Sequence, residues 1–299
     1  MKVLFVGVGS IAKRHIRNLI DLYGKDNIQI DALRRADYGK PDGVARVLTD
    51  YDSIEEKYDA IFITNPTEKH IETIERLKDK TDAFFIEKPI NSCPLDDISG
   101  FEDGKIYYVA CPLRYTKIIQ YLKESIEPAS VLSVRAISSS YLPEWREGVD
   151  YRNTYSAHKE LGGGVSIDLI HEWDYLTYLF GMPQKISKLI TKKSDLELDC
   201  EDVALYLAEY EDKVVELHLD YFGRYPIRRL ELITKEDTVE CDLIRGKVAF
   251  LKAGKELDLS ETRDDYCKRE LKRFFAITHG DCRNENSIEH ANEILKLAR

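Results

Sequence analysis

The chain has 299 residues, of which 43% are hydrophobic and 33% charged, a composition typical of a globular protein with a buried core. Its 54 acidic and 44 basic residues give a formal net charge of −10, which repels nucleic-acid phosphates and anionic lipid headgroups. The first apolar run breaks at Gly7, too early for a signal peptide or a membrane span. The six cysteines are scattered without the paired spacing of a zinc site. We expect a cytoplasmic protein with no metal and no nucleic-acid or membrane partner.

Residues 1–113 alternate short apolar runs with helical patterns. Strands are predicted at 3–8, 28–33, 59–64, 83–89 and 106–112, and helices at 10–24 and 67–80. This alternation is typical of βαβ units and of a parallel sheet. We therefore predict a doubly wound α/β domain of the Rossmann type over 1–113.

Residues 114–299 have a different rhythm. Period-2 segments predict strands at 130–142, 202–210, 213–222, 228–234 and 247–253, with helices at 164–181, 266–280 and 287–299. This pattern predicts an α+β domain with a largely antiparallel sheet. Helices on one face would leave the other face exposed, and the alternating Val, Leu and Tyr residues of 202–210 and 213–222 would make it apolar. We expect a homodimer or homotetramer joined through this sheet.

The glycines of "GVGSIA" follow the first predicted strand and begin the first predicted helix. Gly7, Gly9 and Ala12 fit the pattern G-x-G-x-x-G/A in the position that binds dinucleotides. Gly7 allows a tight turn, Gly9 lets a pyrophosphate approach the backbone, and Ala12 keeps the helix close to the sheet. The helix begins at Ser10 and Ile11, where unpaired N–H groups and the helix dipole favour an anion. The alternative is a plain turn between a strand and a helix.

Arg34 and Arg35 follow the second predicted strand, where an NAD-binding domain usually has an acidic residue. An arginine there can pair with the 2′-phosphate of NADP and stack on adenine. We therefore expect NADP, with NAD possible because Asp31 and Asp37 flank the site and could reach the ribose.

Three further stretches, "ITNPTEKH" at 63–70, "FIEKPI" at 85–90 and the glycine-led 162–181, follow the N-terminal motif in order. Together they resemble the glucose-fructose oxidoreductase, inositol dehydrogenase and rhizopine-catabolism family, Gfo/Idh/MocA. The resemblance implies an N-terminal Rossmann domain, a C-terminal domain with an open-faced sheet, and NAD(P)-linked redox chemistry on sugars and polyols.

The resemblance also assigns cofactor-side positions in the first domain. These are Asn65, Pro66 and His70 beside the nicotinamide, and Glu87, Lys88 and Pro89 in the family's E-K-P motif. In that motif the lysine lies between the substrate hydroxyl and the nicotinamide ribose, and the Lys-Pro bond is commonly cis. The alternative for Lys88 is a solvated loop lysine.

In the second half, Asp168 and His171 match the acidic residue and the histidine that face the substrate in the family. Their spacing is three, whereas the family's is four. Because i,i+3 positions share a helix face, we expect the two to converge still. Asp174 is a possible substitute for Asp168, and a core or surface histidine is the alternative for His171.

The segment 141–164 precedes this helix and is expected to line the substrate pocket. Its candidate residues are Trp145, Arg152 and Tyr155, with Arg146 and His158 beside them, types that stack on sugars or pair with carboxylates and phosphates. Arg114 matches a family arginine near the junction of the domains and is a further candidate for substrate binding. The alternatives are an ordered loop whose aromatic residues only pack and, for Arg114, a structural tie.

We expect catalysis by Lys88, His171 and Asp168, with hydride transfer between nicotinamide and a secondary hydroxyl of an amino, acidic or nucleotide-linked sugar. His171 would exchange the proton, and Lys88 would stabilise the oxygen. Two alternatives stay open: a non-catalytic NAD(P)-binding redox sensor, and a reductase of the same fold for an imine or a tetrapyrrole.

Overall fold

The structure, a computed structural model, describes residues 1–36, 39–101 and 104–299. The chain forms two compact units, residues 1–112 with 263–293 and residues 113–262 with 294–299. Residues 263–293 thus belong to the first unit, whereas the predicted division placed everything after 113 in the second domain. The reason is the aromatic face of helix α6 (Arg263–Thr278), whose Phe274 and Phe275 join the core of the first unit.

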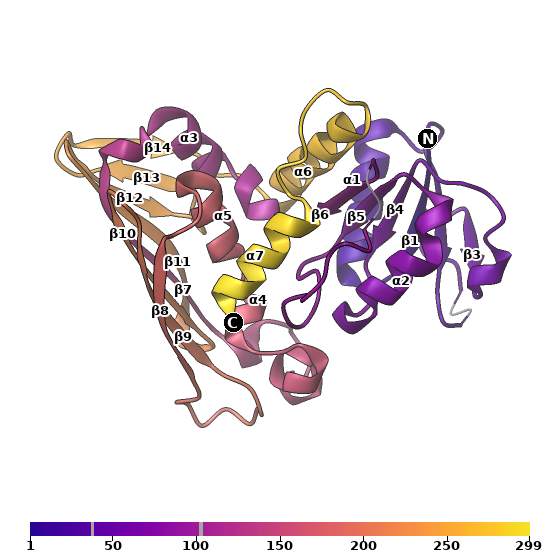
Figure 1. The fold of residues 1–299 in the computed structure, drawn as a ribbon, viewed down its shortest axis with the longest axis horizontal. Coiled ribbons are helices and arrows are strands. Elements are labelled where there is room, and N and C mark those ends of the chain that lie inside the picture. The colour runs from indigo at the N-terminus through magenta and orange to yellow at the C-terminus, as the bar shows by residue number, and fades with distance from the viewer. Residues whose placement is uncertain (37–38, 102–103) are drawn as a thin grey trace. The chain divides into compact units, whose positions relative to one another are not determined.

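The first unit contains a six-stranded parallel sheet (Figure 1). Its strands are β1 (Lys2–Val6), β2 (Gln29–Leu33), β3 (Arg46–Leu48), β4 (Ala60–Ile63), β5 (Ala83–Ile86) and β6 (Ile106–Val109), in the order β3-β2-β1-β4-β5-β6. The central strands are buried along most of their length, which explains their continuous apolar runs. This order confirms the predicted doubly wound Rossmann fold.

Helices of the first unit pack on this sheet through aromatic side chains. α1 (Ser10–Tyr23) and α6 contribute to one core with Phe5, Phe62 and Phe85, and the Phe62 ring lies 4.5 Å from Phe5 and 4.9 Å from Phe85. Phe274 from α6 meets Phe85 edge-on at 5.3 Å. The remaining helices are α2 (His70–Leu77) and α7 (Ile288–Ala298), which begins in this unit.

The second unit contains an eight-stranded sheet (Figure 1). Its strands are β7 (Val131–Tyr141), β8 (Lys185–Thr191), β9 (Val203–Glu209), β10 (Val214–Asp220), β11 (Phe222–Thr234), β12 (Thr238–Asp242), β13 (Lys247–Phe250) and β14 (Lys255–Asp258), in the order β14-β13-β12-β11-β7-β10-β9-β8. All neighbouring pairs are antiparallel except β7 with β10. The prediction of a largely antiparallel sheet is confirmed.

The two faces of this sheet differ. On the face towards α5 (His171–Phe180), Tyr206 meets Trp173 edge-on at 5.3 Å, and Val215 is fully buried. Most of the apolar residues expected on the exposed face therefore lie buried instead. The other face borders a hollow of about 960 Å³, where Leu189 and Leu207 remain 55% and 61% exposed among charged side chains.

The predicted helix over 164–181 is two helices, α4 (Val165–Asp168) and α5. At Leu169 the backbone leaves helical geometry, with φ −99° and ψ 26°, and the Ile170 N–H donates to Ile167 in a tighter turn. The prediction of a single helix was therefore wrong, and the convergence of Asp168 and His171 stays a prediction. The unit also contains α3 (Lys117–Ser125), which was not predicted.

Candidate active site

The carboxyl ends of the central strands meet at one edge of the first sheet. Val6 pairs with Ile63, and Ile63 pairs with Ile86, so the residues that follow each strand lie at the same level. These are the glycine turn after β1, the Thr64–Asn65 segment after β4, and Glu87–Lys88 after β5. The edge brings together most of the predicted cofactor-side residues.

Gly7 and Gly9 have different roles in this turn. Gly7 has φ +83°, and a Cβ atom there would lie 2.9 Å from the backbone of Asn65. The Thr64 hydroxyl also donates to the Gly7 carbonyl at 2.8 Å, which fixes the close approach. At Gly9 an added Cβ would meet nothing within 4 Å. Gly7 is therefore required by the fold, whereas Gly9 leaves open space where the helix begins.

The first turn of α1 suits an anion. Gly9 caps the helix without any side-chain hydrogen bond, and no acidic residue lies in the first turn. The first N–H groups of a helix have no partner within the helix, so those of Ser10 and Ile11 point towards the turn as donors. Ser10 is exposed, whereas Ala12 is fully buried against the sheet. The residues present fit a dinucleotide pyrophosphate, because the backbone at Gly9 is accessible and the first turn of α1 contains no acidic residue.

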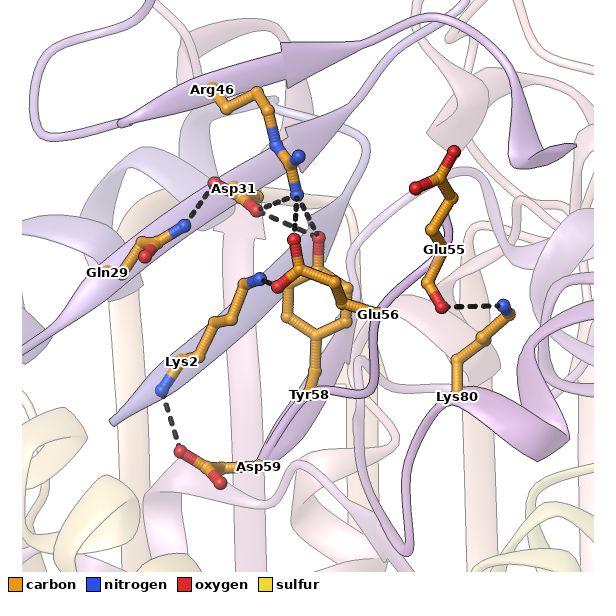
Figure 2. Close-up of polar contacts among 9 residues, drawn as sticks. All are labelled: Lys2, Gln29, Asp31, Arg46, Glu55, Glu56, Tyr58, Asp59 and Lys80. Carbon is orange, nitrogen blue, oxygen red and sulfur yellow. Dashed lines mark hydrogen bonds and ion pairs between the residues drawn. The ribbon is translucent and has the colours of Figure 1, made fainter. Parts of the chain in front are cut away.

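Arg34 and Arg35 follow β2. The Arg34 guanidinium donates to the Gly39 carbonyl at 3.0 Å, and Arg35 is exposed. Asp37 lies outside the described residues. Asp31 is fully buried and accepts hydrogen bonds from Tyr58 and Arg46, both at 2.8 Å, as Figure 2 shows. The alternative in which Asp31 binds the ribose was therefore wrong.

Asn65 and His70 hold the segment after β4. The Asn65 amide donates to Thr73 Oγ1 at 2.7 Å, and its buried Oδ1 meets no hydrogen-bonding group of the described chain. The ring nitrogens of His70 lie 3.0 Å from the Asn65 carbonyl and 3.0 Å from the Pro89 carbonyl. Burial lowers the pKa of His70, and a neutral ring donates to one of these carbonyls at a time. Pro66 is exposed beside them.

The E-K-P motif follows β5 directly. The Lys88–Pro89 bond is cis, as the resemblance implied, and Lys88 is half-buried. Glu87 Oε1 lies 2.7 Å from Nε2 of the buried His15 in α1. Burial alone would raise the pKa of Glu87, but the His15 hydrogen bond and the charges of His15 and Lys88 lower it overall.

In the second unit, Asp168 accepts a hydrogen bond from Tyr221 at 2.7 Å. Tyr155 is 42% exposed, and burial, followed by the charge and hydrogen bonding of nearby Asp168, raises its pKa. Trp145 meets the Tyr221 ring edge-on at 5.2 Å and donates to Ser140 at 2.9 Å. The predicted residues Asp168, Tyr155 and Trp145 thus form one cluster around Tyr221.

The other predicted residues of this unit lie outside this cluster, and Arg114, Asp174 and Arg152 form ion pairs. Arg114 is buried and donates to both carboxylate oxygens of Asp174, at 2.6 and 2.8 Å. Asp174 is therefore a poor substitute for Asp168, because its oxygens are already paired. Arg152 is half-exposed and pairs with Asp150 at 2.8 Å and with Glu197 at 3.1 Å. His171 begins α5 and is half-buried.

The glycine run before α4 is set by close packing. A Cβ on Gly163 would lie 2.3 Å from the Tyr155 carbonyl, and one on Gly164 would lie 2.3 Å from the Glu201 carboxylate. The run thus seats the Tyr155 segment against the start of α4, which ends at Asp168. Glycine is the residue that allows this approach.

Sequence reasoning missed His15, Thr73 and Tyr221. Each is polar and lies within a stretch whose pattern predicts regular structure, so periodicity alone gives no signal for it. The partner of His15 is 72 residues away in the sequence and that of Tyr221 is 53 away. Across the described ranges, no three His, Cys, Asp or Glu side chains are grouped so as to hold a metal ion, and no helix is long and apolar enough to cross a membrane.

A parallel sheet in this order, with a glycine turn that opens onto a helix start, defines a dinucleotide-binding fold. Two family models match the sequence: "Oxidoreductase family, NAD-binding Rossmann fold" over residues 1–100 and "GFO/IDH/MocA C-terminal domain" over residues 119–240. The chain belongs to the Gfo/Idh/MocA family of oxidoreductases.

A curated relative, the uncharacterized oxidoreductase YrbE of Bacillus subtilis (strain 168), is 24% identical over 187 residues, and the match covers 59% of this chain. The match spans about half of that relative, 52% of its length.

Several solved structures share the fold over all of this chain. They include a levoglucosan dehydrogenase in complex with NADH and L-sorbose (TM-score 0.81, 16% identity, 94% of that chain), myo-inositol 2-dehydrogenase from Lactobacillus plantarum (0.78, 18%, 95%) and UDP-N-acetylglucosamine 3-dehydrogenase GnnA from Acidithiobacillus ferrooxidans (0.76, 17%, 95%).

Proposed function

We propose that this protein is an NAD(P)-dependent dehydrogenase or reductase that interconverts a secondary hydroxyl and a ketone on a sugar. The observation that carries the proposal is the carboxyl edge of the first sheet, where an open helix start at Gly9 follows β1 and the Lys88–Pro89 segment follows β5, with only β4 between the two strands. We favour an amino, acidic or nucleotide-linked sugar. The names of the solved structures, which include dehydrogenases of levoglucosan, myo-inositol and UDP-N-acetylglucosamine, support the sugar and polyol class.

The bound nicotinamide supplies the acceptor or donor of the hydride. Gly9, Ser10 and Ile11 would hold the pyrophosphate through backbone N–H groups, and Arg34 and Arg35 would hold the adenosine end.

Three side chains carry the proposed chemistry. The Lys88 ammonium donates a hydrogen bond to the reacting oxygen and stabilises the negative charge that develops on it. His171 accepts the hydroxyl proton during oxidation and returns it during reduction. Asp168, held by Tyr221, binds a neighbouring substrate hydroxyl and is the next candidate for the proton acceptor.

The decisive experiment measures turnover of NAD(H) and NADP(H) with a panel of polyols, sugars, sugar acids, amino sugars and nucleotide sugars. We expect turnover with at least one sugar class. A redox sensor would bind the dinucleotide without turning over any of them, and a reductase of an imine or a tetrapyrrole would respond only to those compounds.

With an active substrate, His171→Ala should lower kcat by about 10²–10⁴-fold, the usual contribution of an acid or base. The dinucleotide Kd should stay unchanged, because His171 lies in the second unit. The matched control is His279→Ala, at an exposed histidine beyond α6. Full activity of the His171 variant would move the proton acceptor to Lys88 or Asp168.

We also propose that a second copy of the chain covers the outer face of the second sheet, giving a homodimer or homotetramer. Exposed Leu189 and Leu207 lie there among charges of both signs, such as Arg229 and Glu240, and a face of mixed sign can complement itself. Light scattering at micromolar concentration should show an oligomer, and Leu207→Glu should shift it towards the monomer. A monomeric parent protein would refute this proposal.

A further inference from the structure

The two chain neighbours of Lys88 are each held by a buried imidazole. His15 Nε2 lies 2.7 Å from the Glu87 carboxylate, on the N-terminal side of the lysine. His70 Nδ1 lies 3.0 Å from the Pro89 carbonyl, on its C-terminal side. Both histidines are 1% exposed. The lysine therefore has an anchor on either flank.

The His15 anchor is rigid. Its ring is packed edge-on against Phe85 at 5.1 Å and lies 6.2 Å from the Phe62 ring. Its Nδ1 is buried and meets no hydrogen-bonding group within the described ranges, so Glu87 is the partner that offsets the cost of burying the imidazole.

The His70 anchor lies between two loops. Its second ring nitrogen lies 3.0 Å from the Asn65 carbonyl, so one side chain contacts the segments after β4 and after β5 and, when neutral, donates to one of the two carbonyls at a time. His15 in turn comes from α1, the helix whose start fits the pyrophosphate. The two anchors therefore tie the lysine segment to the elements that would hold the dinucleotide.

We propose that His15 and His70 are positioning residues that fix the backbone on both sides of Lys88. His15 acts through the Glu87 side chain, and His70 acts through the Pro89 carbonyl. The consequence for catalysis rests on the proposed function of Lys88, but the anchoring itself can be measured without substrate or cofactor.

The test compares His15→Leu and His70→Leu with His15→Gln, whose amide can reach as far as Nε2. Asn18→Leu is the matched control, because Asn18 is fully buried on α1 and its amide has no hydrogen-bond partner within the described ranges. The first readout is amide deuterium exchange of a peptide covering 86–91 in the protein without cofactor. The second is acylation of Lys88, followed by mass spectrometry.

The leucine variants at positions 15 and 70 should speed exchange in this peptide by about tenfold or more, because local opening becomes easier. They should also change the acylation rate of Lys88. With an active substrate, kcat should fall by up to about 10²-fold, the cost of misplacing a reacting group by about 1 Å. His15→Gln and Asn18→Leu should match the parent protein in all three measurements.

Parent-like exchange in the leucine variants would overturn the proposal. If a leucine variant does not fold, His15→Asn replaces it, since its shorter amide cannot reach Glu87. Lys88→Ala is measured alongside: full activity there would contradict the proposed function, whereas faster exchange in the leucine variants would still support the anchoring.

Discussion

The two edges of the first sheet use their polar groups differently. Towards the edge where the strands begin, side chains pair with one another: Lys2 with Glu56, and Asp31, in the middle of β2, with Arg46 at the start of β3 and Tyr58 before β4. The Lys2 backbone donates to Asp59 at 2.7 Å (Figure 2). At the edge where the strands end, the start of α1 presents backbone donors beside an open glycine.

Within one set of strands, the polar groups near one edge therefore stabilise the fold, whereas those at the other edge are available to bind a ligand. A buried carboxylate such as Asp31 is costly unless its hydrogen bonds are made within the chain, so its partners are committed to the fold. Donors at a helix start are accessible to water and can be exchanged for a phosphate at little cost. Substitutions at the first edge should therefore change unfolding, and substitutions at the second should change binding and turnover.

The largest effect is expected from Lys88→Ala. Loss of the ammonium should lower kcat by about 10²–10³-fold, the usual cost of removing one donor from a developing oxyanion, and dinucleotide binding should weaken as well. The control is Lys2→Ala at the opposite edge, which loses the contact with Glu56 and should keep the parent kcat. Steady-state kinetics with an active substrate measures kcat for both variants. Equal kcat values for Lys88→Ala and Lys2→Ala would contradict the proposed difference between the two edges of the sheet.

Next comes the glycine pair of the turn. Gly7→Ala should lower the free energy of unfolding by about 2 kcal/mol or more, because φ is +83° and the new methyl would meet the Asn65 backbone. Gly9→Ala should unfold like the parent, since its methyl meets nothing, and should weaken dinucleotide binding by about tenfold by blocking the backbone. Denaturant titration and calorimetry separate the two, and a stable Gly7→Ala protein would refute the packing argument.

The parallel sheet and the glycine turn could be predicted because their signals are local, whereas the short strand β3 was not predicted. Apolar runs of four to six residues and two glycines after the first of them define the parallel sheet and its first βα unit. Asp31 shows where local signals fail. Its position three residues before Arg34 suggests that it could bind the ribose, but in the structure it bonds to Tyr58 and Arg46, which lie 27 and 15 residues away in the sequence.

Other errors have the same origin in long-range packing. Helical spacing continues across Leu169, so periodicity could not predict the break between α4 and α5. The aromatic face of α6 fits a core in either half of the chain, and only tertiary contacts place Phe274 against Phe85. The anchors of Lys88 depend on pairings between residues 72 and 19 positions apart, which a single sequence does not reveal.

A smaller effect is expected from Tyr58→Phe. Loss of one hydrogen bond to the buried Asp31 should cost about 1–2 kcal/mol of unfolding free energy, with no change in dinucleotide Kd. Burial first, and then the bond to Asp31, raise the pKa of Tyr58 to about 12. Because the folded pKa exceeds the unfolded value of about 10, this contribution is complete below pH 10 and is lost as the pH rises through 12. Urea titrations at several pH values should show that the parent protein loses unfolding free energy as the pH rises through 12, and that the variant loses less.

The smallest effect concerns cofactor choice at the carboxyl edge. If Arg34 and Arg35 face a 2′-phosphate, NADPH should bind more tightly than NADH, because a guanidinium forms charge-assisted bonds with a phosphate. Arg34→Asp should narrow or invert that preference by about tenfold, or about 1.4 kcal/mol, since a carboxylate repels the phosphate and can accept from a ribose hydroxyl. Arg35→Asp, at the more exposed neighbour, tests which of the two carries the effect. The free energy of unfolding should change little, because the Arg34 side chain is partly exposed and its bond to the Gly39 carbonyl lies in a loop. Calorimetry with both dinucleotides is the measurement: equal affinities in the parent protein would remove the arginines from cofactor selection and leave the pyrophosphate cradle as the source of affinity.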